Sequence, residues 1–148
     1  MGLFKPIWMM KNSKMALKAV ERITDEVELE RIVKEAPDYR VCCAAVRKIK
    51  NQETLQKLVY NRYIERTAVS EAVNTITDQN ILCDIAKNYD PPYKDHTFNY
   101  NYSYDYVREL AILKINDVEL LKWLAKNDKY RTIRELSERR LDEISKAT

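Results

Sequence analysis

The residues best suited to recognition chemistry lie in one short segment, HTFNYNYSYDY, which runs from His96 to Tyr106. Aromatic side chains occupy alternate positions there, and six of the ten tyrosines of the chain lie between Tyr89 and Tyr106. A tyrosine offers a large contact area at low entropic cost, which favours protein recognition, and its ring also stacks on nucleic-acid bases. The candidate partner-binding residues are Tyr93, Phe98, Tyr100, Tyr102 and Tyr104.

Three interpretations of this aromatic segment are open. The first is a long loop whose tyrosines pack on the protein's own surface. The second is a presented loop that binds a protein, and the third is a platform that stacks on nucleic-acid bases. Pro91 and Pro92 stiffen the entry to the segment, which helps to present the loop in each case.

A second candidate is a set of basic residues that recurs along the chain, Arg47, Lys48, Lys114, Arg139 and Arg140. Aligned along one edge, these cations would bind phosphates or an acidic partner. The alternative is structural, because cations at helix C-termini complement the helix macrodipole. Acidic neighbours dilute the basic edge, and the net charge of the chain is only +3.

Residues for catalysis are scarce. His96 is the only histidine, and the three cysteines, Cys42, Cys43 and Cys83, form no CxxC pair. A histidine-based zinc site needs several convergent ligands, and neither a glycine-rich phosphate loop nor a nucleophile elbow is present. The sequence therefore predicts a non-enzyme with no cofactor and no metal, whose thiols are reduced and packed as small apolar residues.

Composition points to a cytoplasmic protein. With 148 residues the chain is about one domain long, and no apolar run reaches the ~18 residues of a membrane span. Residues 1–12 contain an apolar cluster that we interpret as a capping segment, with attachment to a membrane surface as the alternative.

The chain also repeats itself. We call Ile23, Ile49, Ile76, Ile115 and Leu141 the repeat markers, and they are separated by 26, 27, 39 and 26 residues. A small residue stands four positions before each marker, at Ala19, Ala45, Ala72, Ala111 and Ser137. Apolar residues stand six and nine positions after the first four markers, at Leu29, Leu55, Leu82 and Leu121 and at Ile32, Leu58, Ile85 and Leu124. These offsets share one helical face, so each repeat is predicted to be two short helices that bury their apolar sides against neighbours.

Polar columns predict the helix ends. Asp25, Asn51, Asp78 and Asp117 stand two positions after the markers and are expected to be N-caps. Asn61, Asn88 and Asn127 stand twelve positions after, and we expect left-handed C-caps there because the chain has only one glycine. The spacing of 39 is the ordinary 27 plus twelve, and the extra residues fall between Asn88 and Val107.

These columns resemble short HEAT-like repeats of the armadillo-type α-solenoid family, in segments such as YRVCCAAVRKIKNQETLQKL and YDYVRELAILKINDVELLKWLAKND. The resemblance covers about residues 13–144 and implies an all-α superhelix of about four helix pairs. The expected domains are a capping segment, 1–12, and a repeat domain, 13–148, with units at 25–50, 51–77, 78–116 (insertion 89–104) and 117–141.

Such repeats specify architecture better than activity. We expect a non-catalytic scaffold that binds a protein partner through its helical groove and the tyrosine-rich loop. The alternative is a nucleic-acid binder that uses the basic edge, as the DNA alkylation-repair glycosylases of this repeat class use a basic concave face. Self-association through Trp8 or Trp123 is a third possibility.

Overall fold

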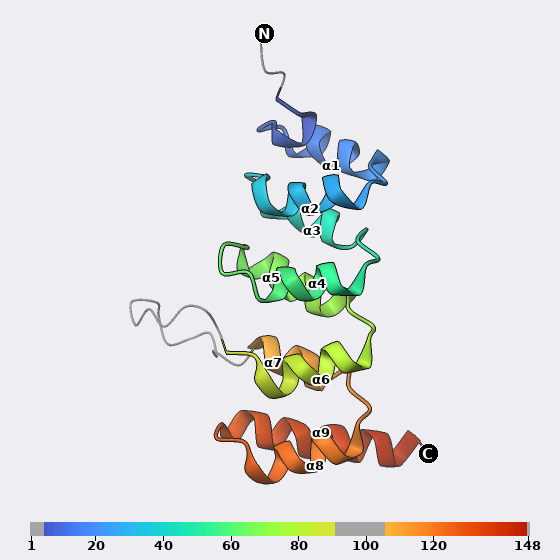
Figure 1. Cartoon of the computed structure of the whole chain (residues 1–148), viewed down its shortest axis with the longest axis vertical. Helices are drawn as coiled ribbons and strands as arrows, with labels where there is room; N and C mark the ends of the chain where they lie inside the picture. The colour runs from blue at the N-terminus through green and yellow to red at the C-terminus, as the bar shows by residue number, and fades with distance from the viewer. Residues whose placement is uncertain (1–4, 91–105, 148) are drawn as a thin grey trace. The chain divides into compact units, whose positions relative to one another are not determined.

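The computed structural model describes residues 5–90 and 106–147, and all regular structure in those ranges is helical (Figure 1). The predicted all-α class is therefore confirmed. The chain divides into two compact units, Met1–Thr75 and Ile76–Thr148, which are described in turn. No helix of the described ranges combines the length and apolar composition needed to cross a membrane.

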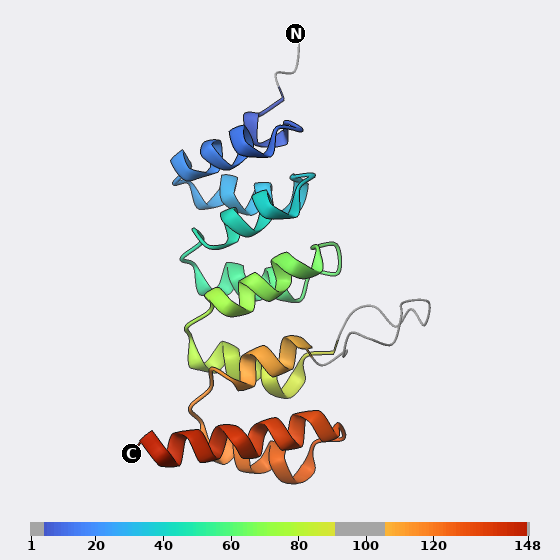
Figure 2. The same cartoon turned by 180° about the vertical axis from the view of Figure 1, so that it is seen from behind.

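Unit 1 in its described part, residues 5–75, contains a 3-10 turn followed by five α-helices. They are η1 (Ile7–Met9), α1 (Ser13–Arg22), α2 (Glu26–Glu35), α3 (Tyr39–Val46), α4 (Gln52–Val59) and α5 (Arg66–Thr75). Helix α3 packs against α1, α2 and α5, and α4 packs against α5. Figure 2 shows the same neighbours from behind, with α3 between α1 and α5.

Unit 2 in its described part contains α6 (Gln79–Asn88), α7 (Tyr106–Ile112), α8 (Val118–Asn127) and α9 (Arg131–Ala147). Helix α6 packs against α7 and α8 against α9, and the two pairs meet where α7 packs against α9. The arrangement parallels unit 1, where consecutive helices also pair and helices two apart in the chain stack.

The repeat columns form the core. All eight apolar residues at six and nine positions after the first four markers are at most 1 % exposed. The markers Ile49, Ile76 and Ile115 are also buried, whereas Ile23 and Leu141 are half-buried. These burials confirm the predicted apolar helical face. Helices this short are unstable alone, and the burial of their apolar faces stabilises the fold.

The predicted N-caps are confirmed. The side chains of Asp25, Asn51, Asp78 and Asp117 each accept a hydrogen bond from a backbone N–H in the first turn of the following helix. Each bond satisfies a donor that the helix itself leaves without a partner. Because these side chains cap the helices that follow, the short turns that lead into α2, α4, α6 and α8 need no glycine.

The predicted left-handed C-caps are wrong, because no residue of the described ranges has a positive φ. Helices α6 and α8 end instead in extended residues, Tyr89 and Asp128, whose N–H groups still bond to carbonyls four residues earlier. Asn88 and Asn127 bond back to their own helices, whereas Asn61 Oδ1 accepts from the Tyr63 N–H. Asn88 Nδ2 donates to Asp84 Oδ1 at 2.9 Å, and Asn127 Nδ2 donates to the Trp123 carbonyl at 2.9 Å.

The described part of the N-terminal segment packs on unit 1 through Trp8. This indole is 2 % exposed, and its Nε1 donates to Glu28 Oε1 at 2.9 Å. The Arg31 guanidinium lies 5.6 Å from the centre of the ring. Ile7 and Met10 remain about half exposed, so the segment covers α1 with one side chain rather than with its whole apolar cluster.

Candidate functional site

Three of the five predicted basic-edge residues donate to the backbone of the preceding repeat. Lys48 Nζ donates to the carbonyls of Val20 and Glu21, at 3.0 and 2.6 Å. Lys114 Nζ donates to the carbonyl of Ile76. We call this contact, made by the basic residue just before a marker, the carbonyl clasp. It satisfies carbonyl groups at a helix end, where the macrodipole also favours a cation.

Arg140 completes the set in unit 2. Its Nε donates to the carbonyl of Ile115 at 3.2 Å and its Nη2 to Asn116 Oδ1 at 3.0 Å. The clasps are half-buried, and partial burial lowers the pKa of Lys114 because it removes water from the ammonium group. Lys48, Lys114 and Arg140 therefore use hydrogen-bond donors on turns of the protein itself.

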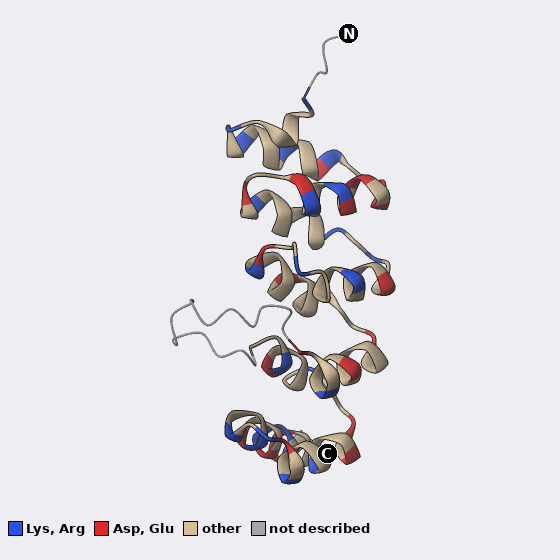
Figure 3. Ribbon diagram, turned by 60° about the vertical axis from the view of Figure 1, so that its left-hand side comes forward, with Lys and Arg blue, Asp and Glu red and all other residues tan. Residues whose placement is uncertain are grey.

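The fourth and fifth basic-edge residues differ. Arg47 Nε pairs with Glu71 Oε1 at 2.6 Å, which joins the end of α3 to α5, and Arg139 is exposed on α9. Thr75 stands at the clasp position before Ile76, but its hydroxyl donates to the Glu71 carbonyl at 2.8 Å. Basic and acidic residues are interspersed on the helices of each unit (Figure 3).

A second polar column, three positions after the marker, fastens the turns from the other side. Glu26 accepts from the backbone N–H groups of Lys50 and Asn51 at 2.9 and 3.1 Å. Gln79 donates to the carbonyl of Lys114 at 3.1 Å and accepts from the N–H of Asn116 at 2.9 Å. The turns of successive repeats are thus bonded in both directions within each unit.

The predicted aromatic binding residues lie outside the described residues. Tyr93, Phe98, Tyr100, Tyr102 and Tyr104, and with them His96, fall in the range 91–105. The residues that flank this range are described. Tyr89 is buried, whereas Asp90 and Tyr106 are exposed.

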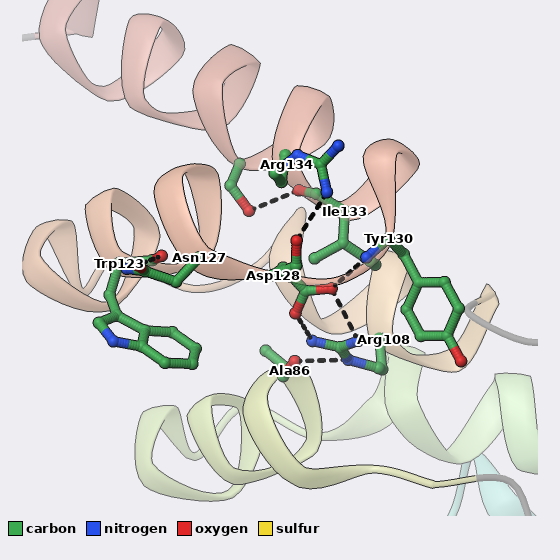
Figure 4. A network of polar contacts seen from close by, with 9 residues as sticks. Ala86, Arg108, Trp123, Asn127, Asp128, Tyr130, Ile133 and Arg134 are labelled. Carbon is green, nitrogen blue, oxygen red and sulfur yellow. Dashed lines mark hydrogen bonds and ion pairs between the residues drawn. The ribbon is translucent and has the colours of Figure 1, made fainter.

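Unit 2 contains a buried ion pair (Figure 4), which lines the same pocket as Tyr89 and Asp90. The side chains of Arg108 on α7 and Asp128, just after α8, are each 6 % exposed and pair directly. Arg108 Nε also donates to the carbonyl of Ala86 at 2.8 Å, and Asp128 Oδ1 accepts from the Tyr130 N–H at 3.0 Å. A buried charge is tolerated only when it is paired and hydrogen-bonded, and both conditions hold here.

Two arginines of unit 2 satisfy helix ends together. Arg134 Nη1 donates to the backbone carbonyl of Asp128 at 2.7 Å, while Arg108 takes the carbonyl of Ala86 near the end of α6. Both α6 and α8 end at this place, so their C-terminal partial charges are compensated by cations of the chain.

The ion pair lies at a pocket of about 290 Å³. Its lining comes from the ends of α6 and α8 and from the start of α7, and comprises Lys87, Asn88, Tyr89, Asp90, Arg108, Trp123, Asn127, Asp128, Lys129 and Tyr130. Trp123 is 47 % exposed and Tyr130 36 %. In Figure 4 these two aromatic side chains lie on either side of the Arg108–Asp128 pair.

Each of these aromatic rings carries an ammonium group on its face. Lys87 Nζ lies 5.5 Å from the centre of the Trp123 ring, and Lys129 Nζ lies 4.5 Å from that of Tyr130. Cations are attracted to the electron-rich face of an aromatic ring, so these pairs hold two positive charges at the pocket. The sequence interpretation connected Trp123 with self-association and did not connect it with Lys87.

A signal for this site does exist in the sequence. Seven positions before the markers stand Ala16, Cys42, Val69, Arg108 and Arg134. An arginine in a column that is otherwise small or apolar is a buried charge in need of a partner. The identity of that partner depends on which loops meet in space, so Asp128 could not be found from spacing alone.

The surroundings of the three cysteine thiols disfavour the reactive thiolate form. Cys42 and Cys43 are buried, and burial raises the pKa of Cys42 to about 11 and raises the pKa of Cys43. Burial also raises the pKa of Cys83, which is partly exposed. Within the ranges 5–90 and 106–147 there is no group of three or more His, Cys, Asp and Glu side chains able to hold a metal ion.

Another polar cluster of unit 1 serves structure. Asp38, the N-cap of α3, accepts from the Ser13 hydroxyl at 2.6 Å and pairs with Arg40 at 2.8 Å. The hydrogen bond from Arg40, followed by that from Ser13, holds the pKa of Asp38 well below its usual range. This carboxylate is therefore ionised at neutral pH, and it links the start of α1 to the start of α3.

Comparison with known proteins gives no further assignment. No protein-family model, no curated protein and no solved structure matches the chain.

Proposed function

We propose that the protein is a HEAT-like α-solenoid of about four helix pairs that acts as a non-catalytic binding module for a protein partner. The single observation that carries the proposal is the aromatic pocket of unit 2. Trp123 is a large, half-exposed aromatic side chain that lines this pocket beside the Arg108–Asp128 pair, and tryptophan is enriched among the few residues that dominate the energy of protein interfaces.

The repeat architecture is supported by recurrence within each unit. Helices two apart in the chain stack, as α1, α3 and α5 do, and the clasp recurs at Lys48, Lys114 and Arg140. Stacked helix pairs present long surfaces and loops to a partner, which is the usual role of such arrays.

The position of the pocket in the sequence supports protein recognition too. Asp90 lines it and directly precedes the aromatic range 91–105. We propose that Tyr93, Phe98, Tyr100, Tyr102 and Tyr104 add contacts to a partner bound at this end of unit 2.

Nucleic-acid binding is the second candidate function, because the chain is net positive and carries Arg47, Lys48, Lys114, Arg139 and Arg140. The clasps count against it. Three of these five cations donate to backbone carbonyls of the chain, which leaves fewer donors for phosphates.

A lysate pull-down tests the proposal. The intact chain is compared with a deletion of residues 91–102, which restores the ordinary repeat length, and circular dichroism checks that the deletion variant is helical. We expect a protein that co-purifies with the intact chain and is reduced or lost with the deletion. Identical protein eluates, or recovery of nucleic acid that falls steeply with salt, would contradict the proposal.

A further inference from the structure

We propose that the segment 5–18 of unit 1 attaches the protein to the surface of an anionic phospholipid bilayer. Its lysines meet the lipid headgroups, and its exposed apolar side chains enter the boundary between headgroups and acyl chains. The inference goes beyond the proposed protein-binding function, whose pocket lies in unit 2, and either can fail without the other.

The positive charge of the chain is concentrated in its first 20 residues. They contain no aspartate or glutamate and four lysines, Lys5, Lys11, Lys14 and Lys18. The net charge of the whole chain is +3, so this stretch carries more positive charge than the chain as a whole. Such a segment is attracted to anionic lipids over a distance set by ionic screening, about 8–10 Å at ordinary salt concentrations.

These four lysines are exposed, and none forms an ion pair with a carboxylate among the residues that the structure describes. Two acidic residues contact the segment, and both have other partners. Glu28 accepts a hydrogen bond from the Trp8 indole. Asp38 accepts one from the Ser13 hydroxyl and pairs with Arg40. The lysines are therefore available to a negatively charged surface.

Three apolar side chains of the same segment, Ile7, Met10 and Met15, are about half exposed. Ile7 begins η1 and Met10 follows it, and residues three apart in a 3-10 turn share one side of the turn. Trp8 between them is buried, so it fixes the segment to unit 1 and leaves its neighbours to solvent. Met15 lies in the first turn of α1, the helix that η1 contacts.

Helix α1 contributes its outer face. Lys14 and Lys18 lie one turn apart, and Met15 lies three positions before Lys18, so these exposed side chains are neighbours on the helix. Ala16 and Val20 face the core instead. In Figure 3, η1 and most of α1 carry blue and no red, and red appears near the end of α1. Positive charge and apolar area thus occur together on one face of this helix.

The chemistry of the segment favours a lipid surface over a protein or a nucleic acid. Lysine is depleted in protein interfaces, where tryptophan, tyrosine and arginine dominate the binding energy. Base stacking requires an exposed aromatic ring, and the aromatic residue of this segment, Trp8, is buried. A bilayer surface requires no fixed arrangement of charges, because long lysine side chains reach the headgroups while their stems lie along apolar surface.

Flotation of the full chain with lipid vesicles tests the inference. Vesicles of equimolar phosphatidylcholine and phosphatidylserine are compared with vesicles of phosphatidylcholine alone, each at low and at high salt. We expect the chain to float with the anionic vesicles and to leave them as the salt concentration rises, because salt screens the lysines. It should not float with the phosphatidylcholine vesicles.

Two double variants separate the contributions. Lys14→Gln/Lys18→Gln should weaken binding to the anionic vesicles about 30-fold, because each lysine close to such a surface contributes about fivefold in affinity. Ile7→Gln/Met15→Gln should weaken it about tenfold, because the apolar contact with the acyl boundary is lost.

Lys122→Gln/Lys126→Gln is the matched control. It removes the same charge from two exposed lysines that also lie one turn apart, but on α8 of unit 2. This variant should bind the anionic vesicles as the unaltered chain does. Circular dichroism checks that all the variants remain helical.

Four outcomes would overturn the inference. They are the absence of flotation with anionic vesicles, equal flotation with phosphatidylcholine vesicles, equal losses from the α1 and α8 lysine variants, and full binding by the Ile7→Gln/Met15→Gln variant. Binding of polyglutamate or of an oligothymidine strand without flotation would assign the lysines to another partner and would also reject it. Capture of a protein from a lysate bears on the proposed function alone.

Discussion

The two units treat the same register position in opposite ways. Seven positions before the repeat marker, unit 1 has Ala16, Cys42 and Val69, and unit 2 has Arg108 and Arg134. In unit 1 these side chains are buried, and in unit 2 Arg108 is buried and Arg134 half-buried. One backbone plan therefore accepts either an apolar contact or a charged network at one point.

Both solutions meet the same need, which is to cover carbonyls where the preceding helix ends. In unit 1 the Cys42 thiol points to the Ala36 carbonyl at 3.5 Å, and in unit 2 Arg134 donates to the Asp128 carbonyl at 2.7 Å. Ala36 follows the marker Ile23 by thirteen residues, and Asp128 follows the marker Ile115 by the same number. A thiol is a weak donor that requires nothing in return, whereas a buried arginine requires a carboxylate. In unit 2 Asp128 meets that requirement for Arg108, and both residues line the pocket.

Removing the carboxylate from the network should give the largest effect. Asp128→Ala leaves the Arg108 guanidinium buried without its ion-pair partner, and the free energy of unfolding should fall by about 3–5 kcal/mol. Urea denaturation of the full chain measures this loss. The double variant Arg108→Met/Asp128→Leu removes both charges and should lose clearly less, and an equal loss would show that the pair is not the cause.

Breaking a clasp should come next. Lys48→Met keeps most of the side-chain volume but removes both bonds to the Val20 and Glu21 carbonyls, and unfolding free energy should fall by about 1–2 kcal/mol. Lys57→Met is the matched control, because Lys57 is exposed on α4. Thermal and urea unfolding would measure both variants. A loss as small as that of the control would mean that the clasp contributes nothing.

Adding a clasp just before the marker Ile76, where Thr75 stands in place of a cation, should change the free energy of unfolding by a smaller amount and in the opposite direction. Thr75→Lys places an ammonium group at the register position of Lys48 and Lys114, within reach of the end of α3, and we expect a gain of about 0.5–1 kcal/mol. The increase in urea midpoint checks it, with Thr75→Met as the control for side-chain length. A lysine variant no more stable than the methionine variant would contradict the expectation.

The smallest effect concerns the chemical reactivity of Cys42, the unit 1 residue seven positions before the marker Ile49. Because burial raises the pKa of Cys42 to about 11, its thiol should remain protonated at pH 8 and react with maleimide far more slowly than Cys83 does. Mass spectrometry after timed labelling gives the order, and all three thiols should react in denaturant. Labelling of Cys42 as fast as of Cys83 would mean that unit 1 does not shield this position.

The periodicity of the sequence predicted much of the fold, whereas the remaining contacts depend on which segments meet in space. Leu55 and Asn51 follow from sequence because burial of a helical face and N-capping are local events, set by offsets within one repeat. The left-handed C-caps failed because an extended residue ends the helices equally well, as Tyr89 does. The backbone contact of Lys48 and the partner of Arg108 were missed because each contact joins segments separated by at least one helix, 28 and 20 positions apart.

The clasp has a consequence for how such a chain grows. A donor just before one marker and its acceptor at or just before the preceding marker are both encoded within a stretch of about one repeat, as Arg140 and the Ile115 carbonyl are, 25 residues apart. Duplication of any such stretch of the gene would therefore copy donor and acceptor together. A newly inserted repeat would arrive with its own joint to the older one, and lineages could lengthen or shorten the protein without inventing a new interface.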